Sequence, residues 1–286
     1  MKTMTVCLPP IGGCLIAAES MASASSDDWQ PQTKDQRRFI REYYMRARGE
    51  ICALPEIESV ASESVSTINE FLEERGFQIK LEEFKKSSKS FGVASVFKLF
   101  LEWIKPGRIT SIRNRMYPAV YLEAGVSFFR SKHSNNPILS VKAKNGDIVS
   151  MTILSEPPVG FDLLELIGVI STEMKPAMEF DGAIFPMIDY NREIDISWME
   201  GMKLTSSAGP WVIEQALQQT KFRMNELGAK VESAASMGIR LLCCTPSDPP
   251  LVIDKPFLLW VNRSSFHHPL FVGYFAEENW KRPGKL

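Results

Sequence analysis

The stretch Phe222-Arg-Met-Asn-Glu-Leu-Gly228-Ala-Lys-Val-Glu-Ser-Ala-Ala235 decides the fold of this 286-residue chain. It completes a strand-like run from Ala216 to Asn225, and Glu226-Leu227-Gly228 has the composition of a turn. The segment that follows, Ala229 to Asp254, has little core-forming pattern of its own. A connection of about 25 residues without secondary structure is long for a compact domain, so we expect this segment to be functional.

Several other segments have the composition of β-strands. After the long connection come Pro256 to Asn262 and Pro269 to Phe275, with a Ser- and His-containing turn between them. Upstream, the predicted extended segments are Val93 to Trp103, Val120 to Phe129, Ile138 to Lys142, Ile148 to Leu154 and Ala183 to Ile196, the last broken by Pro186. The first of these is almost continuously apolar, so we interpret it as a buried central strand. Lys144-Asn145-Gly146-Asp147 predicts a hairpin turn, because Asn-Gly suits positive φ.

Apolar residues at helical spacing predict three amphipathic helices. They are marked by Phe39, Ile40, Tyr43 and Tyr44, by Val60, Val65, Ile68, Phe71 and Leu72 before Gly76, and by the run Phe161 to Ile170. Ser25 to Thr33 has the composition of a loop. Because helices and antiparallel strands are mixed without a βαβ repeat, the predicted fold class is α+β with mostly antiparallel sheets.

The composition argues against several classes of function. The 33 basic and 34 acidic side chains leave a net charge of -1, so we expect no nucleic-acid partner. No stretch approaches the roughly 18 uninterrupted apolar residues of a membrane-spanning helix, so we expect no membrane span. The cysteines, Cys7, Cys14, Cys52, Cys243 and Cys244, have neither metal-type nor disulfide-type spacing and fit a reduced chain. No P-loop, dinucleotide-binding glycine fingerprint or HExxH occurs, so we expect no cofactor and no metal.

The N-terminal segment has two interpretations. Met1 to Ala24 combines an apolar centre at Cys14 to Ala18 with the small residues Ala22-Ser23-Ala24, which together resemble a secretory signal and its cleavage site. Pro9-Pro10 precedes that centre and favours instead a buried helix that begins after the prolines. Both interpretations stay open at this point.

We divide the chain accordingly. Residues 1–38 are a leader, an N-terminal helix or a possible signal segment, and residues 39–286 form a single domain. The cysteine pattern favours a cytoplasmic location, and the chain would be secreted if residues 1–24 act as a signal.

Taken together, these segments resemble the serpin family. The opening stretch is similar to the family's strand and hinge, in which a Glu and a Gly, here Glu226 and Gly228, precede a run of small residues. Asp254-Lys-Pro-Phe257-Leu-Leu-Trp-Val and Pro269-Leu-Phe-Val-Gly273 are similar to the family's closing hairpin. The likeness continues upstream through Gly146-Asp-Ile-Val-Ser-Met151-Thr-Ile-Leu, Val93 to Trp103, Ser66-Thr-Ile-Asn69-Glu-Phe-Leu-Glu-Glu and Phe39 to Gly49. It implies a serpin-like fold with N-terminal helices, mostly antiparallel sheets and a long exposed loop near the C-terminus.

The chain also departs from the family's pattern. It is shorter than typical serpins, and the missing length falls in the N-terminal helices and in one strand of the main sheet. Leu8-Pro9-Pro10-Ile11 stands where the family has Ser-Pro-x-Ser. Shortened serpins are known among poxviruses, so the resemblance extends to a viral origin and to interaction with a host.

The resemblance implies a protease inhibitor that acts as a suicide substrate, and not an enzyme. A serine or cysteine protease would cleave the reactive loop, at about residues 229–254, and the loop would insert as a new strand into the main sheet. Counting along the loop places the reactive bond at Leu242-Cys243, with Arg240-Leu241 as the alternative. We expect the chain to be a monomer. The other interpretation is a non-inhibitory serpin-fold protein whose loop or surface binds a partner.

The hinge of the loop allows a check by strand alternation. The resemblance assigns the hinge to Glu226, Gly228, Ala229, Val231, Ser233, Ala234 and Ala235. In a strand, Ala229, Val231, Ser233, Ala235 and Met237 share one face, and Lys230, Glu232, Ala234, Ser236 and Gly238 share the other. The hinge side chains on the first face are small enough to pack in a closed core, except that of Val231, where overpacking costs roughly 1–3 kcal/mol. We therefore expect Val231→Ala to favour insertion, Val231→Arg to prevent it, and Glu232→Arg on the solvent face to change little.

Three further motifs have ordinary explanations. Cys243-Cys244 suggests a nucleophile or redox pair, but adjacent cysteines rarely bridge and no base is placed beside them. His267-His268 suggests metal binding, but neighbouring strand residues point to opposite faces, so a turn is the better interpretation. Asn262-Arg263-Ser264 is an N-glycosylation sequon that is usable only in a secreted chain.

Overall fold

The computed structural model of the chain describes residues 2–84, 91–207, 209–229 and 248–284, and the largest sheet in these ranges has seven strands. Every neighbouring pair of strands in it is antiparallel. In spatial order its strands are β1 (Met4–Val6), β20 (Phe271–Phe275), β19 (Phe257–Asn262), β10 (Ile148–Ile153), β9 (Ile138–Lys142), β8 (Val126–Arg130) and β11 (Lys175–Pro176). The predicted β9–β10 hairpin and the closing pair β19–β20 are confirmed, with Gly146 at φ 90° in the hairpin turn.

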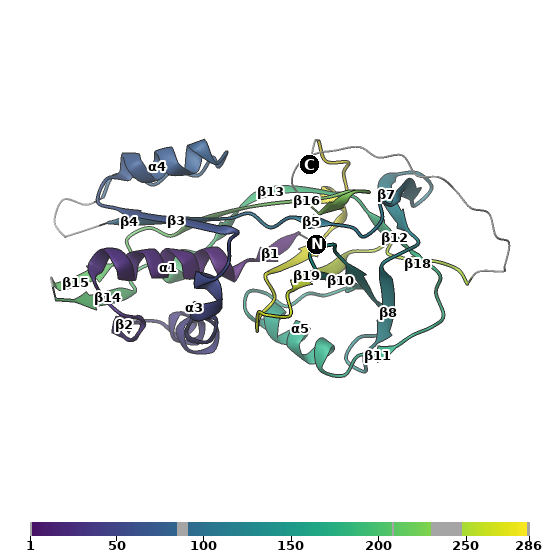
Figure 1. Ribbon diagram of the computed structural model, residues 1–286, viewed down its shortest axis with the longest axis horizontal. Coiled ribbons are helices and arrows are strands. Elements are labelled where there is room, and N and C mark those ends of the chain that lie inside the picture. Colours follow the sequence, from purple (N-terminus) through teal and green to yellow (C-terminus); the bar gives the residue numbers. More distant parts are fainter. Residues whose placement is uncertain (1, 85–90, 208, 230–247, 285–286) are drawn as a thin grey trace.

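A second sheet contains the hinge. Its strands, in order, are β13 (Ile188–Asp195), β16 (Leu217–Met224), β17 (Gly228–Ala229) and β5 (Leu101–Glu102). Beside it lies a two-stranded sheet of β3 (Ile57–Ser62) and β4 (Gly92–Phe97). Figure 1 shows β3 and β4 as a flat pair between two helices, α4 (Val65–Glu74) on one face and α1 (Leu8–Ala22) on the other.

The predicted strand Val93 to Trp103 is extended, but it is not one continuous central strand. β4 ends at Phe97, β5 begins at Leu101, and Trp103 forms an isolated bridge to Ala143. β4 pairs with β3 along one edge, and no strand among the described residues pairs with its other edge. The prediction of a continuous central strand is therefore wrong, because an apolar run reports burial and not the strand's hydrogen-bonding partners.

Two smaller sheets complete the β-structure. The first, in order, consists of β18 (Leu251–Val252), β12 (Ala183–Pro186), β7 (Tyr117–Leu122) and β6 (Arg108–Ile112), in which β18 and β12 are parallel. The second consists of β15 (Gly209–Val212), β14 (Lys203–Ser206) and β2 (Trp29–Gln30). The single strand predicted over Val120 to Phe129 is wrong, since the chain turns at Gly125, with φ 74°, and passes from β7 into β8 of another sheet. The break predicted at Pro186 is confirmed, because it separates β12 from β13.

Several helices pack against the sheets. Besides α1 and α4 they are α2 (Lys34–Arg38), the π-helix η2 (Phe39–Tyr44), α3 (Met45–Cys52), α5 (Asp162–Thr172) and the 3-10 turns η1 (Ser26–Asp28), η3 (Ser197–Met199) and η4 (Glu277–Asn279). The helices predicted from Phe39, from Val65 and over Phe161 to Ile170 are confirmed, but Val60 lies in β3. Residues 25–33 contain η1 and β2 and are not only a loop. No helix in the described part of the chain is long and apolar enough to cross a membrane.

The helix α1 is packed on almost every side and carries a buried carboxylate. It begins at Leu8, so the two prolines lie in its first turn and do not precede it. Glu19 is buried and accepts hydrogen bonds from Trp29 Nε1 (2.9 Å), from the Tyr44 hydroxyl (2.5 Å) and from the Arg48 guanidinium (2.8 Å). Burial, and then the hydrogen bond to this carboxylate, raise the pKa of Tyr44, which therefore stays protonated as a donor. The network holds α1, β2 and α3 together.

Candidate functional site

Gly228 and Ala229 of the predicted hinge lie between two strands of the second sheet. Gly228 and Ala229 pair with Glu102 and Leu101 of β5 on one side, and Ala229 also pairs with Met224 of β16 on the other. Both pairings are antiparallel. The chain thus enters the space between β5 and β16 as the first two residues of a strand.

A tryptophan fixes the turn that leads into this strand. The Trp103 backbone N–H donates to the Leu227 carbonyl (3.0 Å), and its indole Nε1 donates to the Asn225 carbonyl (3.0 Å). The Gly107 N–H donates to the Glu226 carbonyl (2.6 Å). Trp103 is almost fully buried, and these bonds set the direction in which the chain leaves the turn.

Gly228 is required by close approach and not by its φ angle. A Cβ atom at this position would lie 2.0 Å from the Leu101 carbonyl oxygen and 3.0 Å from the Glu102 Cα, both of which are backbone atoms of β5. No rotation of a side chain can relieve such a contact. A side chain at residue 228 would therefore separate β17 from β5.

Beyond the hinge, a cavity of about 340 Å³ lies between β4 and β16, and we call it the gap cavity. Residues of α1, among them Ile11 and Cys14, form its floor. Phe77, Ile79 and Leu81, which follow α4, line its opposite side. Burial raises the pKa of the Cys14 thiol to about 12, so this cysteine is a packing residue and not a nucleophile.

The segment of residues 76–82, which we call the roof segment, is bonded to β16 across the gap cavity. The Gln78 N–H donates to Gln219 Oε1 (2.8 Å). Glu82 and Gln215 exchange two bonds of 2.9 and 2.8 Å, each between a backbone group of Glu82 and the amide side chain of Gln215. These bonds are exposed, and each is worth about 0.5–1.5 kcal/mol.

The charged side chains in the described lining of the gap cavity are all basic. Its described lining contains the basic residues Arg75, Lys98, Lys221 and Arg223 and no aspartate or glutamate. Three of these bases have carboxylate partners outside the lining, namely Glu58 for Arg75 and Lys98 and Asp189 for Arg223.

Lys221 differs from the other three bases. Its ammonium donates to the Gly76 carbonyl and lies 4.8 Å from the Phe77 ring centroid, and no described carboxylate lies within ion-pair distance. Burial, and then the neighbouring charge of Arg223, lower the pKa of Lys221. An anion beside this ammonium would relieve that repulsion.

The predicted hinge residues fall into two groups. Glu226, Gly228 and Ala229 lie within the described residues, at the turn and the start of β17. Val231, Ser233, Ala234 and Ala235, both candidate reactive bonds, Arg240-Leu241 and Leu242-Cys243, and Cys244 lie outside the described residues. Their roles stay predictions.

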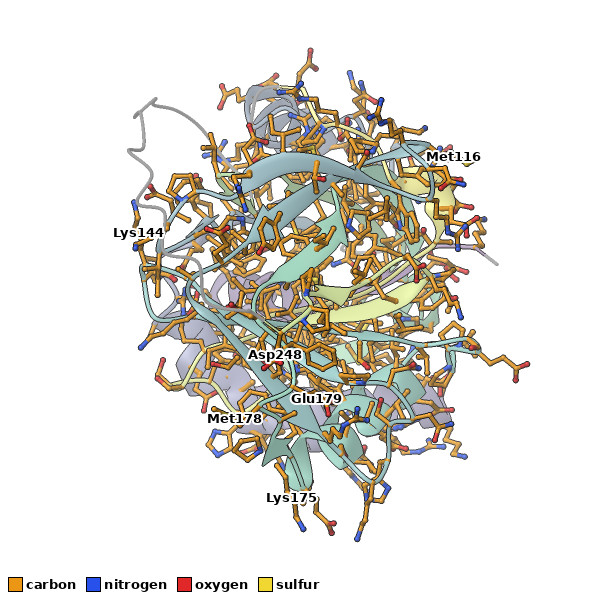
Figure 2. All side chains as sticks on the ribbon, turned by 90° about the vertical axis from the view of Figure 1, so that its right-hand side faces the viewer. Met116, Lys144, Lys175, Met178, Glu179 and Asp248 are labelled. Carbon is orange, nitrogen blue, oxygen red and sulfur yellow. The ribbon has the colours of Figure 1, made fainter. Side chains whose placement is uncertain are left out.

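The described chain on either side of residues 230–247 is held by backbone hydrogen bonds. Figure 2 shows Lys144, which bonds to the β5 residue Glu102 beside the hinge, and Asp248, which lies near Met178 and Glu179. From there the Asp181 N–H donates to the Pro249 carbonyl (3.4 Å), and the chain continues into β18.

The two neighbouring histidines have separate partners. His267 Nδ1 contacts Glu50 Oε1 (2.5 Å), whereas the His268 ring packs on Tyr43 with a centroid distance of 5.0 Å. No group of three or more His, Cys, Asp or Glu side chains in the described ranges could hold a metal ion. In the sequon, Asn262 ends β19, and Arg263 is half-buried between Glu56 and Asp147.

Reasoning from the sequence did not find the basic lining of the gap cavity. Lys98 and Lys221 are isolated in the sequence, and only the spacing of β4 and β16 places them on opposite sides of one cavity. The available signal was the alternation of β16, in which Gln219, Lys221 and Arg223 share the face opposite to the buried Gln218, Thr220 and Met224.

Solved structures share this architecture. Serpin48 of the insect Tenebrio molitor is 13% identical, with a TM-score of 0.59, over 96% of this chain and 91% of that one. A serpin from Schistosoma mansoni is 9% identical, with a TM-score of 0.60, over 96% and 95%. Human thyroxine-binding globulin is 10% identical, with a TM-score of 0.56, over 96% and 91%.

These likenesses define the class of fold. The chain has the serpin fold, and the α+β prediction with mostly antiparallel sheets is confirmed. No family model matches the sequence, and no curated protein does.

Proposed function

We propose that this chain inhibits a serine or cysteine protease as a suicide substrate, by inserting its cleaved loop between β4 and β16. The observation that carries the proposal is the position of β17, which already lies between β5 and β16 and leads into the gap cavity. A strand that continued from Ala229 would run antiparallel to both β4 and β16. It would supply ladder partners to the edges of both strands.

The register of β17 predicts the neighbours of each inserted residue. Ala229 pairs with Met224 and with Leu101, so an unbroken continuation sets residue 231 between Phe222 and Leu99. Residue 233 would lie between positions 220 and 97, and residue 235 between positions 218 and 95. Because Ala229 is buried, the small odd-numbered residues of the hinge would all face α1, in agreement with the alternation.

The same register changes what we expect of Glu232. Continued pairing would set this residue opposite Lys221 on β16 and Lys98, which directly follows β4, on the face that carries the basic lining. Opposite charges in directly paired positions contribute about 0.2–1 kcal/mol each, and like charges destabilise. Glu232→Arg would therefore hinder insertion, where the alternation by itself predicted little change.

The covalent chemistry belongs to the protease. Its nucleophile attacks the carbonyl carbon of the reactive bond, the peptide C–N bond breaks, and the amine leaves with a proton from the protease's general acid. The upstream part of the loop stays attached as an ester or thioester. Insertion then has to be faster than hydrolysis of that bond. In this proposal the loop provides the bond that the protease cleaves, and the gap cavity provides the space that allows rapid insertion.

The direct test is a complex that survives denaturation. The chain is incubated with chymotrypsin-like, trypsin-like and papain-like proteases and analysed by denaturing gel electrophoresis. We expect one class to form a band at the summed mass, with Val231→Ala increasing it and Val231→Arg converting the chain into a plain substrate, because a buried unpaired charge costs several kcal/mol. If every protease that cuts the loop releases it without a complex, the inhibitor proposal fails.

The reactive bond is assigned by the new N-terminus of the released fragment. A fragment that begins at Cys243 supports Leu242-Cys243 and a protease with an apolar primary pocket, whereas one that begins at Leu241 supports Arg240-Leu241 and a trypsin-like protease. A fragment beginning elsewhere excludes both and leaves Arg240 as a solvated loop charge.

A second function is favoured by one specific likeness. Thyroxine-binding globulin has a solved structure in complex with thyroxine, aligned over 98% of this chain with a TM-score of 0.53 and 11% identity. The alternative function is therefore a non-inhibitory serpin-fold protein that binds a partner without inserting its loop. Loop cleavage without protease trapping, together with retained partner binding, would support it.

The compartment and origin stay predictions. We expect a monomeric chain that retains residues 1–24, and the resemblance implies a viral source. Intact-mass spectrometry of the expressed protein should find Met1 or the acetylated residue after it, and a new terminus near Ser25 would instead demonstrate processing for secretion.

A further inference from the structure

The gap cavity combines an apolar interior with a basic face. Its floor is made of α1 side chains such as Ile11 and Leu15, and the neighbouring wall of β4 contributes Val93 and Phe97. The four basic residues of its lining stand without any acidic residue among the described residues that enclose it. Such a site favours anionic ligands over cationic ones, because an anion is attracted to the basic side chains and a cation is not.

We propose that the gap cavity binds a small amphipathic carboxylate, such as a medium-chain fatty acid, with its alkyl chain over α1 and its carboxylate at Lys221. Lys221 is the anchor because its ammonium has only the Gly76 carbonyl and the Phe77 ring as partners within the described ranges. Lys98, on the opposite wall, is half-exposed and is shared with Glu58 at 3.3 Å. Lys98 would therefore attract the ligand carboxylate more weakly than Lys221 does.

The dimensions of the gap cavity limit the ligand. Its 340 Å³ lies at the lower end of the roughly 300–1,000 Å³ of small-molecule sites, which suits a single alkyl chain or one aromatic ring. The uncharged polar groups on its walls, among them Ser95 and Thr220, are few relative to the apolar ones. An apolar chain would therefore displace water from surfaces that have little to bond it.

The ligand and the loop would compete for the same space. Both would place a carboxylate between Lys98 and Lys221, the loop through Glu232 and the ligand through its head group. This competition rests on the proposed loop insertion, whereas binding itself does not. A bound carboxylate would slow insertion and turn an inhibitor into a substrate, so it would act as a regulator of the proposed function.

Binding is tested on the intact chain by isothermal titration calorimetry with decanoate below its aggregation range. We expect one site per chain, with decanol and decylamine binding at least tenfold more weakly. Lys221→Gln should weaken decanoate binding roughly tenfold, as expected for loss of a hydrogen bond to a charged group. Lys221→Arg, which keeps the charge, should retain most of the affinity.

A matched control separates the site from general charge effects. Lys142 of β9 is exposed and outside the gap cavity, so Lys142→Gln should bind decanoate like the parent chain. The proposal is overturned if decanoate does not bind, if decanol or decylamine bind equally well, or if Lys221→Gln and Lys142→Gln behave alike. Thermal denaturation of each variant confirms that it is folded.

Competition is tested separately, with a protease that the chain traps. Decanoate should raise the number of inhibitor molecules consumed per protease trapped, and Lys221→Gln should need a higher concentration for the same effect. Binding without an effect on trapping would overturn the competition and leave the site. A chain that traps no protease but binds decanoate as expected would overturn the proposed function and not the ligand site.

Discussion

Two parts of the β-structure, the seven-stranded sheet and the paired strands around the gap cavity, differ in how completely they are filled. At the centre of the first, β19 has strands on both sides, and five of its six residues are buried. In the second, β4 and β16 face each other across the gap cavity, and among the described residues only β17 lies between the two sides, next to β5. The first region is a finished core, whereas the second has the space and the open edges for one more strand.

The largest expected effect is on the free energy of unfolding, when a leucine is shortened to alanine in each of the two regions. Leu259 of β19 is fully buried, so Leu259→Ala should lower the free energy of unfolding by about 2–5 kcal/mol. Leu99 lines the gap cavity and is only half-buried, so Leu99→Ala should cost about 1 kcal/mol or less. Urea denaturation measures both. Equal losses would mean that the gap region is packed as tightly as the core.

The next effect concerns the entrance to the gap cavity. In Gly228→Ala the added methyl group would meet the Leu101 carbonyl oxygen, so β17 should detach from β5. We expect severalfold more inhibitor to be consumed per protease trapped, because insertion would start from a detached strand. Gly284→Ala serves as a control, since nothing lies within 4 Å of a Cβ there. Unchanged trapping in Gly228→Ala would break the link between β17 and insertion.

A smaller effect is expected from charge in the gap cavity. Glu232→Arg would replace two attractions, to Lys98 and Lys221, by two repulsions of about 0.2–1 kcal/mol each. The ratio of chain cleaved to protease trapped should rise in Glu232→Arg and change less in Glu232→Gln. Adding Lys221→Glu should restore part of the loss in Glu232→Arg. Absence of that restoration would show that residue 232 does not reach β16.

The smallest effect is a pH dependence outside the gap region. Burial lowers the pKa of His268, whose ring packs on Tyr43, so the folded chain favours the neutral ring. The unfolded chain takes up a proton near pH 6.5, so this contribution to stability is present above that pH and is lost as pH falls toward the lower folded pKa.

His268→Gln should therefore lose less stability than the parent chain between pH 7.5 and pH 5. The exposed His133 provides the control, because His133→Gln should follow the parent chain. Denaturant midpoints at the two pH values measure the difference. An equal change of stability with pH in His268→Gln and in the parent chain would show that His268 does not cause the pH dependence.

Much of the fold could be predicted because the deciding residues are local. The Asn-Gly turn, the apolar run of β19 and the helical spacing of α5 each specify an element without reference to the rest of the chain. The resemblance predicted a hinge here because Glu226, Gly228 and the small residues after them form a recognisable pattern, and the roles of these residues stay a prediction. Two failures, at Phe97 to Leu101 and at Gly125, are places where the chain changes strand partners inside a segment whose composition predicts one strand.

The gap cavity itself could not be predicted, since a cavity is a property of the distance between strands. Lys98 and Lys221 acquire their shared role only because β4 and β16 run on opposite sides of it. Likewise, the clash that requires glycine at residue 228 depends on the backbone of β5. The shared position of Lys98 and Lys221 and the close approach at Gly228 both depend on tertiary structure, and neither produces a periodic pattern in the sequence.

The central claim is that the loop can become a strand in the gap cavity, and limited proteolysis followed by thermal denaturation tests it most directly. The chain is cut within residues 230–247, the two fragments are kept together, and the unfolding midpoint is compared with that of the uncut chain. An inserted strand should raise the midpoint by about 10 °C or more, since each kcal/mol gained shifts it by about 2–4 °C. The rise should be smaller in Gly228→Ala. A midpoint that stays the same or falls after cleavage would contradict the account.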